Sequence, residues 1–207
     1  MPDGSTLLVF ALASAALVAV PGPAVLYIVT RAIAQGRSAG VVSALGIEAG
    51  ALLHVGAAVV GLSAILSSSA TAFAFVKYAG AAYLVLLGVQ RLRQRSASSL
   101  DALPAERNSV LFRRGMIVNA MNPKVAVFFL AFLPQFVDPD GGPVALQVAL
   151  LGLVFIAIAT ALDLGWALAA GTAGQALRSS LRVRQRLDVL SGVTFVGLGA
   201  AAALARR

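Results

Sequence analysis

The chain has 207 residues, of which 59% are hydrophobic and only 12% are charged, and its mean hydropathy is +0.91. This composition leaves too little polar surface to solvate a globule, so it excludes an ordinary water-soluble protein. The net charge of +8 does not indicate nucleic-acid binding, because the basic residues lie mostly in short connections between apolar runs. The absence of cysteine excludes dithiol electron transfer and thiolate metal sites.

Six apolar runs follow one another, each near or above the ~17–25 residues that cross the hydrocarbon of a bilayer. They cover residues 6–30, 41–66, 70–90, 115–137, 144–174 and 189–205. The first run is expected to be a retained span and not a signal peptide, since an acid and no base precede it. The sequence therefore predicts an all-α, multi-pass membrane protein with about six transmembrane helices.

The connections between the runs alternate in charge. The basic ones lie at 31–37, 91–114 and 178–186, and the ones without basic residues at 67–69 and 138–142. By the positive-inside rule the basic set faces the cytoplasm, which puts both termini outside. Arg206 and Arg207 run against this orientation, and a five-span chain with a cytoplasmic N-terminus is the alternative.

Prolines interrupt the first and fourth runs, at Pro21-Gly22-Pro23 and at Asn122-Pro123. A proline in a helix frees the carbonyl four residues earlier, here those of Leu17, Ala19 and Asn119, and an unsatisfied carbonyl is costly in hydrocarbon. Gly22 and Asn122 can each cap a new half-helix, whose free amides would face an anion. Such paired breaks are typical of discontinuous helices around a transporter's binding site, although they could merely kink the helices for packing.

The arrangement of the runs predicts two related halves within one transmembrane domain, 1–207. Residues 1–90 and 115–207 would each hold three spans, and residues 91–114 would be a cytoplasmic linker. An odd number of spans in each half makes the two halves inverted, which is a common arrangement in secondary transporters.

Only two of the eight acidic residues, Glu48 and Asp163, lie well inside predicted spans. A low-dielectric interior disfavours the ionised carboxylate, so each can exchange a proton or pair with a substrate ammonium. The alternative is a structural ion pair or polar contact with Lys124, Lys77 or His54. We favour a functional role for these two acids over a structural one, because ionisable residues inside membrane spans are usually functional.

Helical spacing places Gly46, Gly50 and His54 on one face of the second span and Glu48 on the opposite face. Small residues let helices approach closely, so the glycines are expected to pack against a neighbouring helix while Glu48 faces a cavity. His54 can relay protons, because imidazole titrates near neutral pH, or it can serve packing through a hydrogen bond.

Two further residues beside the breaks are candidate substrate contacts. Lys124 directly follows Pro123, so its ammonium could hold a substrate carboxylate or could snorkel to the cytoplasmic interface. Tyr27 lies one turn after Pro23 and is the aromatic residue most expected to reach a substrate.

Several motifs, in order and spacing, make the chain resemble the lysine exporter and resistance-to-homoserine/threonine (LysE/RhtB) family over nearly its whole length. They are Pro21-Gly22-Pro23, Gln35-Gly36-Arg37-Ser38-Ala39-Gly40, Gly80-Ala81-Ala82-Tyr83-Leu84, Phe112-Arg113-Arg114-Gly115, Asn119, Asn122-Pro123-Lys124, Leu133-Pro134-Gln135-Phe136 and Asp163. The resemblance implies proton-driven efflux of amino acids or close analogues across a bacterial cytoplasmic membrane. One departure is Ala51, where many relatives have an aspartate, while this chain has an acid at Glu48.

We therefore expect a secondary active exporter that has an amino-acid substrate, protons and the lipid bilayer as partners, needs no cofactor and is no enzyme. A homodimer is possible. The alternatives are a membrane-embedded enzyme, in which Glu48, His54 and Asp163 would be acid–base groups, and a membrane scaffold. No nucleophile or metal-ligand motif in the sequence supports an enzyme. A divalent metal cargo is disfavoured by the single histidine and the absence of cysteine.

Overall fold

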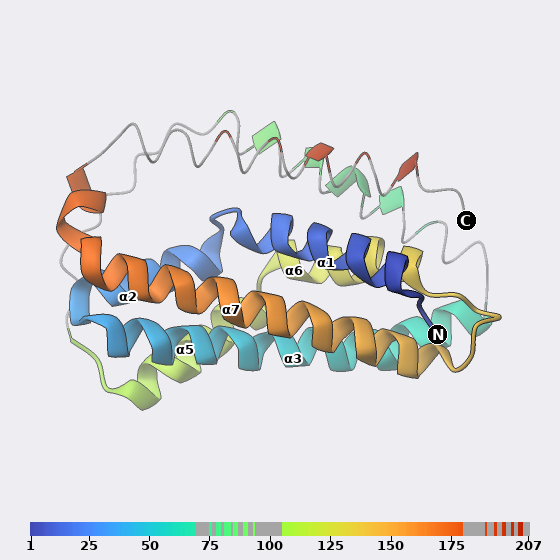
Figure 1. Ribbon diagram of the computed structural model, residues 1–207, viewed down its shortest axis with the longest axis horizontal. Helices are drawn as coiled ribbons and strands as arrows, with labels where there is room; N and C mark the ends of the chain where they lie inside the picture. Colours follow the sequence, from blue (N-terminus) through green and yellow to red (C-terminus); the bar gives the residue numbers. More distant parts are fainter. Residues whose placement is uncertain are drawn as a thin grey trace.

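A computed structural model of the chain describes residues 1–68 and 105–179, with scattered residues between 75 and 93 and between 189 and 204 (Figure 1). The predicted spans 70–90 and 189–205 and most of the predicted linker therefore lie largely outside the described residues, as does Lys77.

Every regular element in the described ranges is a helix. Their bounds are α1, Gly4–Ala19; α2, Pro23–Gln35; α3, Arg37–Ser68; α5, Asn108–Ala120; α6, Pro123–Val127; a π-helical turn, Phe128–Phe132; a 3₁₀ turn, Leu133–Phe136; and α7, Val144–Ser179. The helix α5 begins inside the segment 91–114 that the sequence assigned to the linker.

Four predicted membrane spans correspond to these helices. Two continuous stretches, Arg37–Gly61 of α3 and Val144–Thr172 of α7, are long and apolar enough to cross a bilayer. The other two spans are bent pairs: α1 and α2 meet at 54°, and α5 meets Pro123–Phe136 at 44°. The prediction of an all-helical membrane protein with proline-broken helices is confirmed for this part of the chain.

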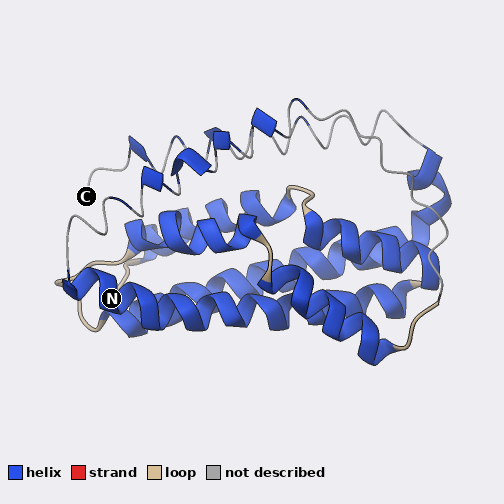
Figure 2. Cartoon of the chain, turned by 180° about the vertical axis from the view of Figure 1, so that it is seen from behind, coloured by secondary structure: helices blue, strands red, loops and turns tan. Residues whose placement is uncertain are grey.

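Both breaks lie near the middle of the bundle's length, where Figure 2 shows two loops between helices. The two bent pairs run in opposite directions along the bundle, since α1 starts at the end where the 3₁₀ turn finishes (Figure 1). The continuous helix α3 packs against both α5 and α7. The two breaks therefore lie at a common depth beside the continuous helices α3 and α7.

A single residue, Gly36, separates α2 from α3. Its φ of 88° lies in the left-handed region, where a side chain would be strained, and its amide donates to the carbonyl of Ala32. The helix α2 therefore has a sharp turn at one end and the break at Pro21–Pro23 at the other.

Two glycines allow α3 and α5 to touch through their backbones. A Cβ atom on Gly46 would lie 2.2 Å from the carbonyl oxygen of Phe112, and one on Gly50 would lie 2.5 Å from that of Met116. Both distances are shorter than any ordinary contact. The predicted close approach along this face is confirmed, and Glu48 is on the other side of α3.

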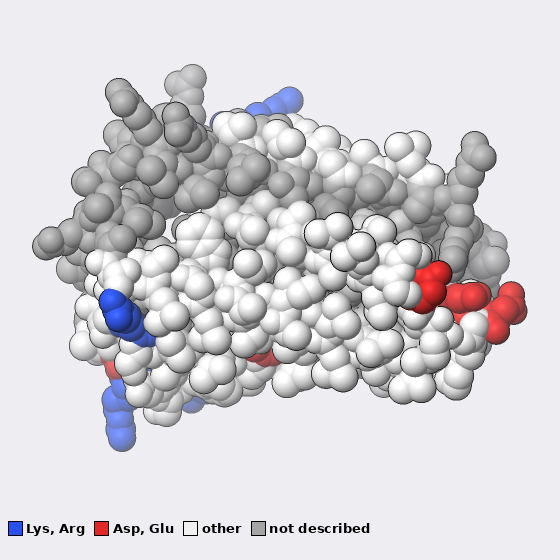
Figure 3. All heavy atoms as spheres, viewed as in Figure 1, with Lys and Arg blue, Asp and Glu red and all other residues white. Residues whose placement is uncertain are grey.

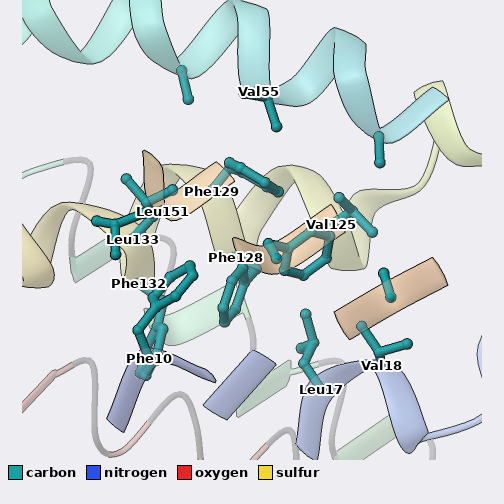
Figure 4. Packing of buried hydrophobic residues seen from close by; sticks show 14 of the residues in the cluster. Phe10, Leu17, Val18, Val55, Val125, Phe128, Phe129, Phe132, Leu133 and Leu151 are labelled. Atoms are coloured by element: carbon teal, nitrogen blue, oxygen red, sulfur yellow. The ribbon is translucent and has the colours of Figure 1, made fainter. Parts of the chain in front are cut away.

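The largest apolar cluster lies where α1, of the first bent pair, meets the segment after Pro123, of the second. The ring of Phe128 is 5.8 Å from that of Phe10, 5.1 Å from that of Phe132 and 5.4 Å from that of Phe155, measured between centroids. Figure 4 shows Phe10, Phe128 and Phe132 packed side by side, with Leu17 and Val125 nearby. This core fixes α1 against the segment that follows the second break.

Charged side chains separate toward the two ends of the bundle. On the face in Figure 3 most Lys and Arg atoms gather at one end and most Asp and Glu atoms at the other. The N-terminal amine donates to the carbonyl of Gly141, so the N-terminus and the loop before α7 share the acidic end. The predicted orientation requires this, since it places both of them outside.

Candidate functional site

The first break leaves the start of α2 without a side-chain cap. Val20 and Gly22 are extended, and Pro23 occupies the first helical position, where it has no amide to offer. The next amides, those of Ala24 and Val25, have no acceptor within the helix, and no side chain caps them. The N-terminal end of α2 is thus a site of partial positive charge.

The second break is capped by its own residues. The side chain of Asn122 accepts from the amide of Lys124 at 3.1 Å and donates to that of Asn119 at 3.2 Å. Asn119 in turn donates to the carbonyl of Ile47 on α3 at 2.8 Å. These bonds hold the break against α3, so the amides after the second break are less available to a ligand than those of α2.

His54 bonds the carbonyl that Pro123 frees. That carbonyl belongs to Asn119, and it accepts from the amide of Asn122 at 3.0 Å and lies 2.8 Å from Nε2 of His54. A carbonyl can only accept, so Nε2 carries the proton in this contact. The imidazole also stacks on Phe129, with centroids 6.3 Å apart. The packing role considered from the sequence is therefore the one the structure displays.

Lys124 connects the two breaks. Its ammonium donates to the carbonyl of Val20 at 2.7 Å, and its stem passes 3.4 Å from where a Cβ of Gly22 would be. The side chain is buried, with 6% of the residue exposed, so it does not snorkel to the interface. Residues about one hundred positions apart in sequence thus meet at mid-depth.

A cavity of about 30 Å³ lies between the two breaks, and residues from all six numbered helices line it. Its walls are Leu17, Val18, Ala24, Val25, Ile47, Glu48, Asn119, Asn122, Lys124, Val125, Phe155, Ala159 and Asp163. Five sequence-predicted residues, Glu48, Asn119, Asn122, Lys124 and Asp163, are therefore brought together here.

The two buried acids face this cavity, and three of their four carboxylate oxygens lack a hydrogen-bond partner among the described residues. Glu48 is 7% exposed and Asp163 is 2% exposed. Both carboxylate oxygens of Glu48 and Oδ1 of Asp163 have no hydrogen-bond partner among the described residues. The two carboxyl groups repel each other, and Lys124 attracts that of Asp163.

Such a pair can take up a cation. A second negative charge in a buried pair is costly, because hydration is lost and the charges repel. A proton or a bound ammonium between Glu48 and Asp163 relieves both costs. In the part of the chain that the structure describes, no group of three or more His, Cys, Asp or Glu side chains could hold a metal ion.

The remaining candidates from the sequence lie beside the cavity or away from it. Pro21, Gly22, Pro23 and Pro123 shape the breaks but do not line the cavity. His54 lies behind Asn119, and the hydroxyl of Tyr27 donates to the carbonyl of Leu111 at 2.8 Å instead of reaching the cavity.

Sequence reasoning missed the apolar wall formed by Leu17, Val18, Ile47, Val125 and Phe155. These residues are ordinary components of hydrophobic spans, and only their position opposite the two acids distinguishes them.

The comparisons with known proteins agree with this architecture. A family model described as LysE type translocator matches residues 15–206. An uncharacterized membrane protein of Vibrio cholerae is 31% identical over 189 residues, which cover 90% of each chain. No solved structure matches the chain.

Two relatives carry functional names. A homoserine/homoserine lactone efflux protein of Salmonella typhimurium is 33% identical over 190 residues, again 90% of each chain. A leucine efflux protein of an Enterobacter species is 30% identical over 150 residues, which cover 72% of this chain and 68% of the relative. The match over nearly the whole chain confirms the resemblance inferred from the motifs, and the chain belongs to the family of LysE type translocators.

Proposed function

We propose that this protein is a secondary active exporter that moves amino acids or close analogues out of the cell across the bacterial cytoplasmic membrane, driven by proton influx. The observation that carries the proposal is the pair of buried carboxyl groups, three of whose oxygens lack a hydrogen-bond partner among the described residues, in a cavity between two helix breaks. The names of the homoserine and leucine efflux relatives support an amino-acid substrate.

The cavity offers complementary charge to both ends of an amino acid. The substrate ammonium would lie between Glu48 and Asp163, where it neutralises the pair. The substrate carboxylate would face the uncapped amides of Ala24 and Val25 and the ammonium of Lys124.

Competition between a proton and the substrate couples their movements. A proton that enters from outside neutralises the carboxyl pair and weakens its hold on the substrate ammonium, so the substrate leaves outward. When the site faces the cytoplasm the proton leaves, and the restored negative charge attracts the next substrate. A ligand shifts a conformational equilibrium only by its differential affinity, and here both ligands act on the same two carboxyl groups.

The size of the cavity requires the helices to move. A cavity of about 30 Å³ is several times smaller than the ~150 Å³ cavity that holds one benzene molecule in an engineered protein core, so an amino acid does not fit the site as it stands. The bends of 54° and 44° at the two breaks supply hinges at the depth of the cavity. Transport therefore requires the helices around the cavity to separate.

Transport into proteoliposomes tests this function. Purified protein is reconstituted, a pH gradient is imposed, and the uptake of labelled amino acids is measured for the wild type and for the double variant Glu48→Gln/Asp163→Asn. We expect gradient-dependent flux of some members of the panel, and its loss in the double variant. Asp140→Asn, which neutralises an exposed acid at the far end of the bundle, is the matched control and should transport normally.

Each outcome bears on a separate part of the proposal. Flux that persists unchanged in the double variant would remove the two acids from the mechanism while leaving an exporter. Flux that ignores the pH gradient would reject proton coupling. Wild-type protein that moves no amino acid in the panel would reject the substrate class.

A further inference from the structure

A second buried polar cluster lies at the cytoplasmic end of α2, away from the cavity. The side chain of Arg31 is only 6% exposed, and its guanidinium forms an ion pair with Glu106 at 2.9 Å. The guanidinium also lies 5.8 Å from the ring centre of Tyr27. A buried arginine is costly unless it is paired, so the position of Glu106 is tightly coupled to that of α2.

Three more contacts join the same two regions. Gln35 donates from Nε2 to the carbonyl of Glu106 at 2.9 Å, and Tyr27 donates to the carbonyl of Leu111 at 2.8 Å. Arg114 forms a second ion pair with Glu106 from the side of α5. The cytoplasmic half of α2 is therefore tied by polar bonds to the first turn of α5 and to Glu106, two residues before it.

The described residues of α3 and α7 that contact α2 form apolar clusters with it. Val25, Val29 and Ala32 form a cluster with Ala170 of α7, and Ile28 packs with Ala44 and Ile47 of α3 and Ala167 of α7. Apolar surfaces can slide or separate into lipid at little cost, whereas ion pairs break abruptly. Among the described contacts of α2, those with α5 and Glu106 are therefore the ones that define a distinct closed position.

The helix α2 is built to move as a unit. It is a rod of 13 residues with a break at Val20–Gly22 at one end and Gly36, at a φ of 88°, at the other. Its first turn lines the cavity, while its last two turns carry Arg31 and Gln35. Movement of the rod away from α5 would connect the cavity with the cytoplasm.

The polar cluster is also incompletely satisfied. Oε2 of Glu106 and Oε1 of Gln35 are buried without a hydrogen-bond partner among the described residues. A network that leaves acceptors unpaired costs less to open than a fully bonded one, because water satisfies those acceptors on opening.

We propose that Arg31, Glu106 and Arg114 form the cytoplasmic gate of this protein, and that separation of α2 from α5 at these ion pairs admits substrate to the cavity. The proposal rests on the exporter function argued above, since a gate presupposes alternating access. The gate residues touch neither the cavity nor the proposed substrate, so they control access without contributing to binding.

Thiol accessibility tests the gate without any need for a known substrate. The chain has no cysteine, so a single Ala24→Cys on the cavity wall is the sole target for a membrane-impermeant methanethiosulfonate reagent applied from the cytoplasmic side. Adding Glu106→Gln should increase the rate of labelling by about tenfold or more, because one mutation removes both ion pairs. Asp140→Asn, an acid outside the gate, should leave the rate unchanged.

A second cysteine position and two milder variants distinguish opening of the gate from an increase in labelling that is caused by misfolding. Ala159→Cys lines the same cavity from α7, and should respond as Ala24→Cys does. Arg31→Gln leaves the ion pair between Arg114 and Glu106, and Tyr27→Phe leaves both ion pairs of Glu106, so each should increase labelling by less than Glu106→Gln. An unchanged labelling rate at both cysteine positions in Glu106→Gln protein that elutes as a single species would overturn the gate.

Cross-linking tests the gate by holding it shut. In the variant Gln35→Cys/Glu106→Cys, a short bis-thiol reagent should hold the gate shut, block labelled amino-acid flux and release it on reduction. Full flux in the cross-linked protein would contradict the gate. If the wild-type protein transports no amino acid, the exporter proposal fails, and the labelling rates still decide whether α2 opens toward the cytoplasm.

Discussion

At the scale of single residues, Lys124 is the only described cation on the cavity wall, and it serves two acceptors at once. It donates to the carbonyl of Val20 and attracts the carboxyl group of Asp163. The first contact holds the two breaks together and the second partly neutralises the acid pair. A bound amino acid would compete with Lys124 for Asp163, so the residue links occupancy of the cavity to the geometry of the breaks.

Replacing Lys124 with methionine keeps the length of the side chain and removes its charge. We expect Lys124→Met to lower stability by ~3–5 kcal/mol, because it leaves a buried carboxylate without its cation. Differential scanning fluorimetry in detergent measures the shift in Tm. The double variant Lys124→Met/Asp163→Asn should recover part of the stability lost in Lys124→Met. If the double variant instead loses as much stability as the two single variants added together, the residues do not interact.

His54 gives a second prediction at this scale, since it donates to the carbonyl freed by Pro123. His54→Phe keeps an aromatic ring against Phe129 and removes the donor, and we expect it to cost ~1–3 kcal/mol of stability. His54→Gln, which can still donate, should cost less. Equal Tm values for both variants would show that the hydrogen bond to Asn119 contributes little, and unchanged transport in both would assign His54 to structure alone.

At the scale of helices, the close contact of α3 with α5 is what places Glu48 on the cavity wall. The contact depends on two positions without a side chain, Gly46 and Gly50. A Cβ at either position meets backbone of α5 and not a flexible side chain, so the clash is relieved only if one helix shifts. A shift of α3 would carry Glu48 away from Asp163.

We therefore expect Gly46→Ala to destabilise the protein by ~1–3 kcal/mol through overpacking and to reduce transport. The matched control is Gly56→Ala on the same helix, where a Cβ meets nothing within 4 Å. That substitution should be neutral or slightly stabilising, since alanine favours a helix by about 1 kcal/mol over glycine. Tm measurements on the two variants decide, and equal values would mean that the helices tolerate a wider separation.

The features that the sequence predicted depend on local chemistry. The breaks at Pro21–Pro23 and at Asn122–Pro123 follow from the missing proline amide, and the packing face of α3 follows from the spacing of Gly46 and Gly50. Burial of Glu48 also follows from its place within a long apolar run. None of these predictions requires knowledge of which helix lies beside which.

The features that it missed depend on how helices are rotated and tilted against one another. The bond from Lys124 to Val20 was not foreseen, its placement at the interface was wrong, and Tyr27 bonds α5 instead of facing the cavity. Arg31 was read only as a marker of orientation, whereas it forms a buried ion pair with Glu106. A helix that is apolar all round carries little periodicity, so the pattern of residues does not fix its rotation.

At the scale of the whole molecule, the proposed gate can admit substrate from the cytoplasm only if the end of the bundle that carries it faces the cytoplasm. The basic end of the bundle holds Arg31, Glu106 and Arg114, and the acidic end holds the N-terminus beside Gly141. The positive-inside rule puts the first end in the cytoplasm. The opposite insertion would place this gate at the outer surface.

Single cysteines at the two ends test this orientation in intact cells. We expect Ser5→Cys and Gly142→Cys, at the acidic end, to react with an impermeant maleimide added outside, and Asn108→Cys to react only after the membrane is permeabilised. The five-span alternative makes a different prediction, since its N-terminus is cytoplasmic and Ser5→Cys would then be protected. Because the N-terminal amine bonds the loop at Gly141, protection of Ser5→Cys together with labelling of Gly142→Cys would contradict the fold as well as the topology.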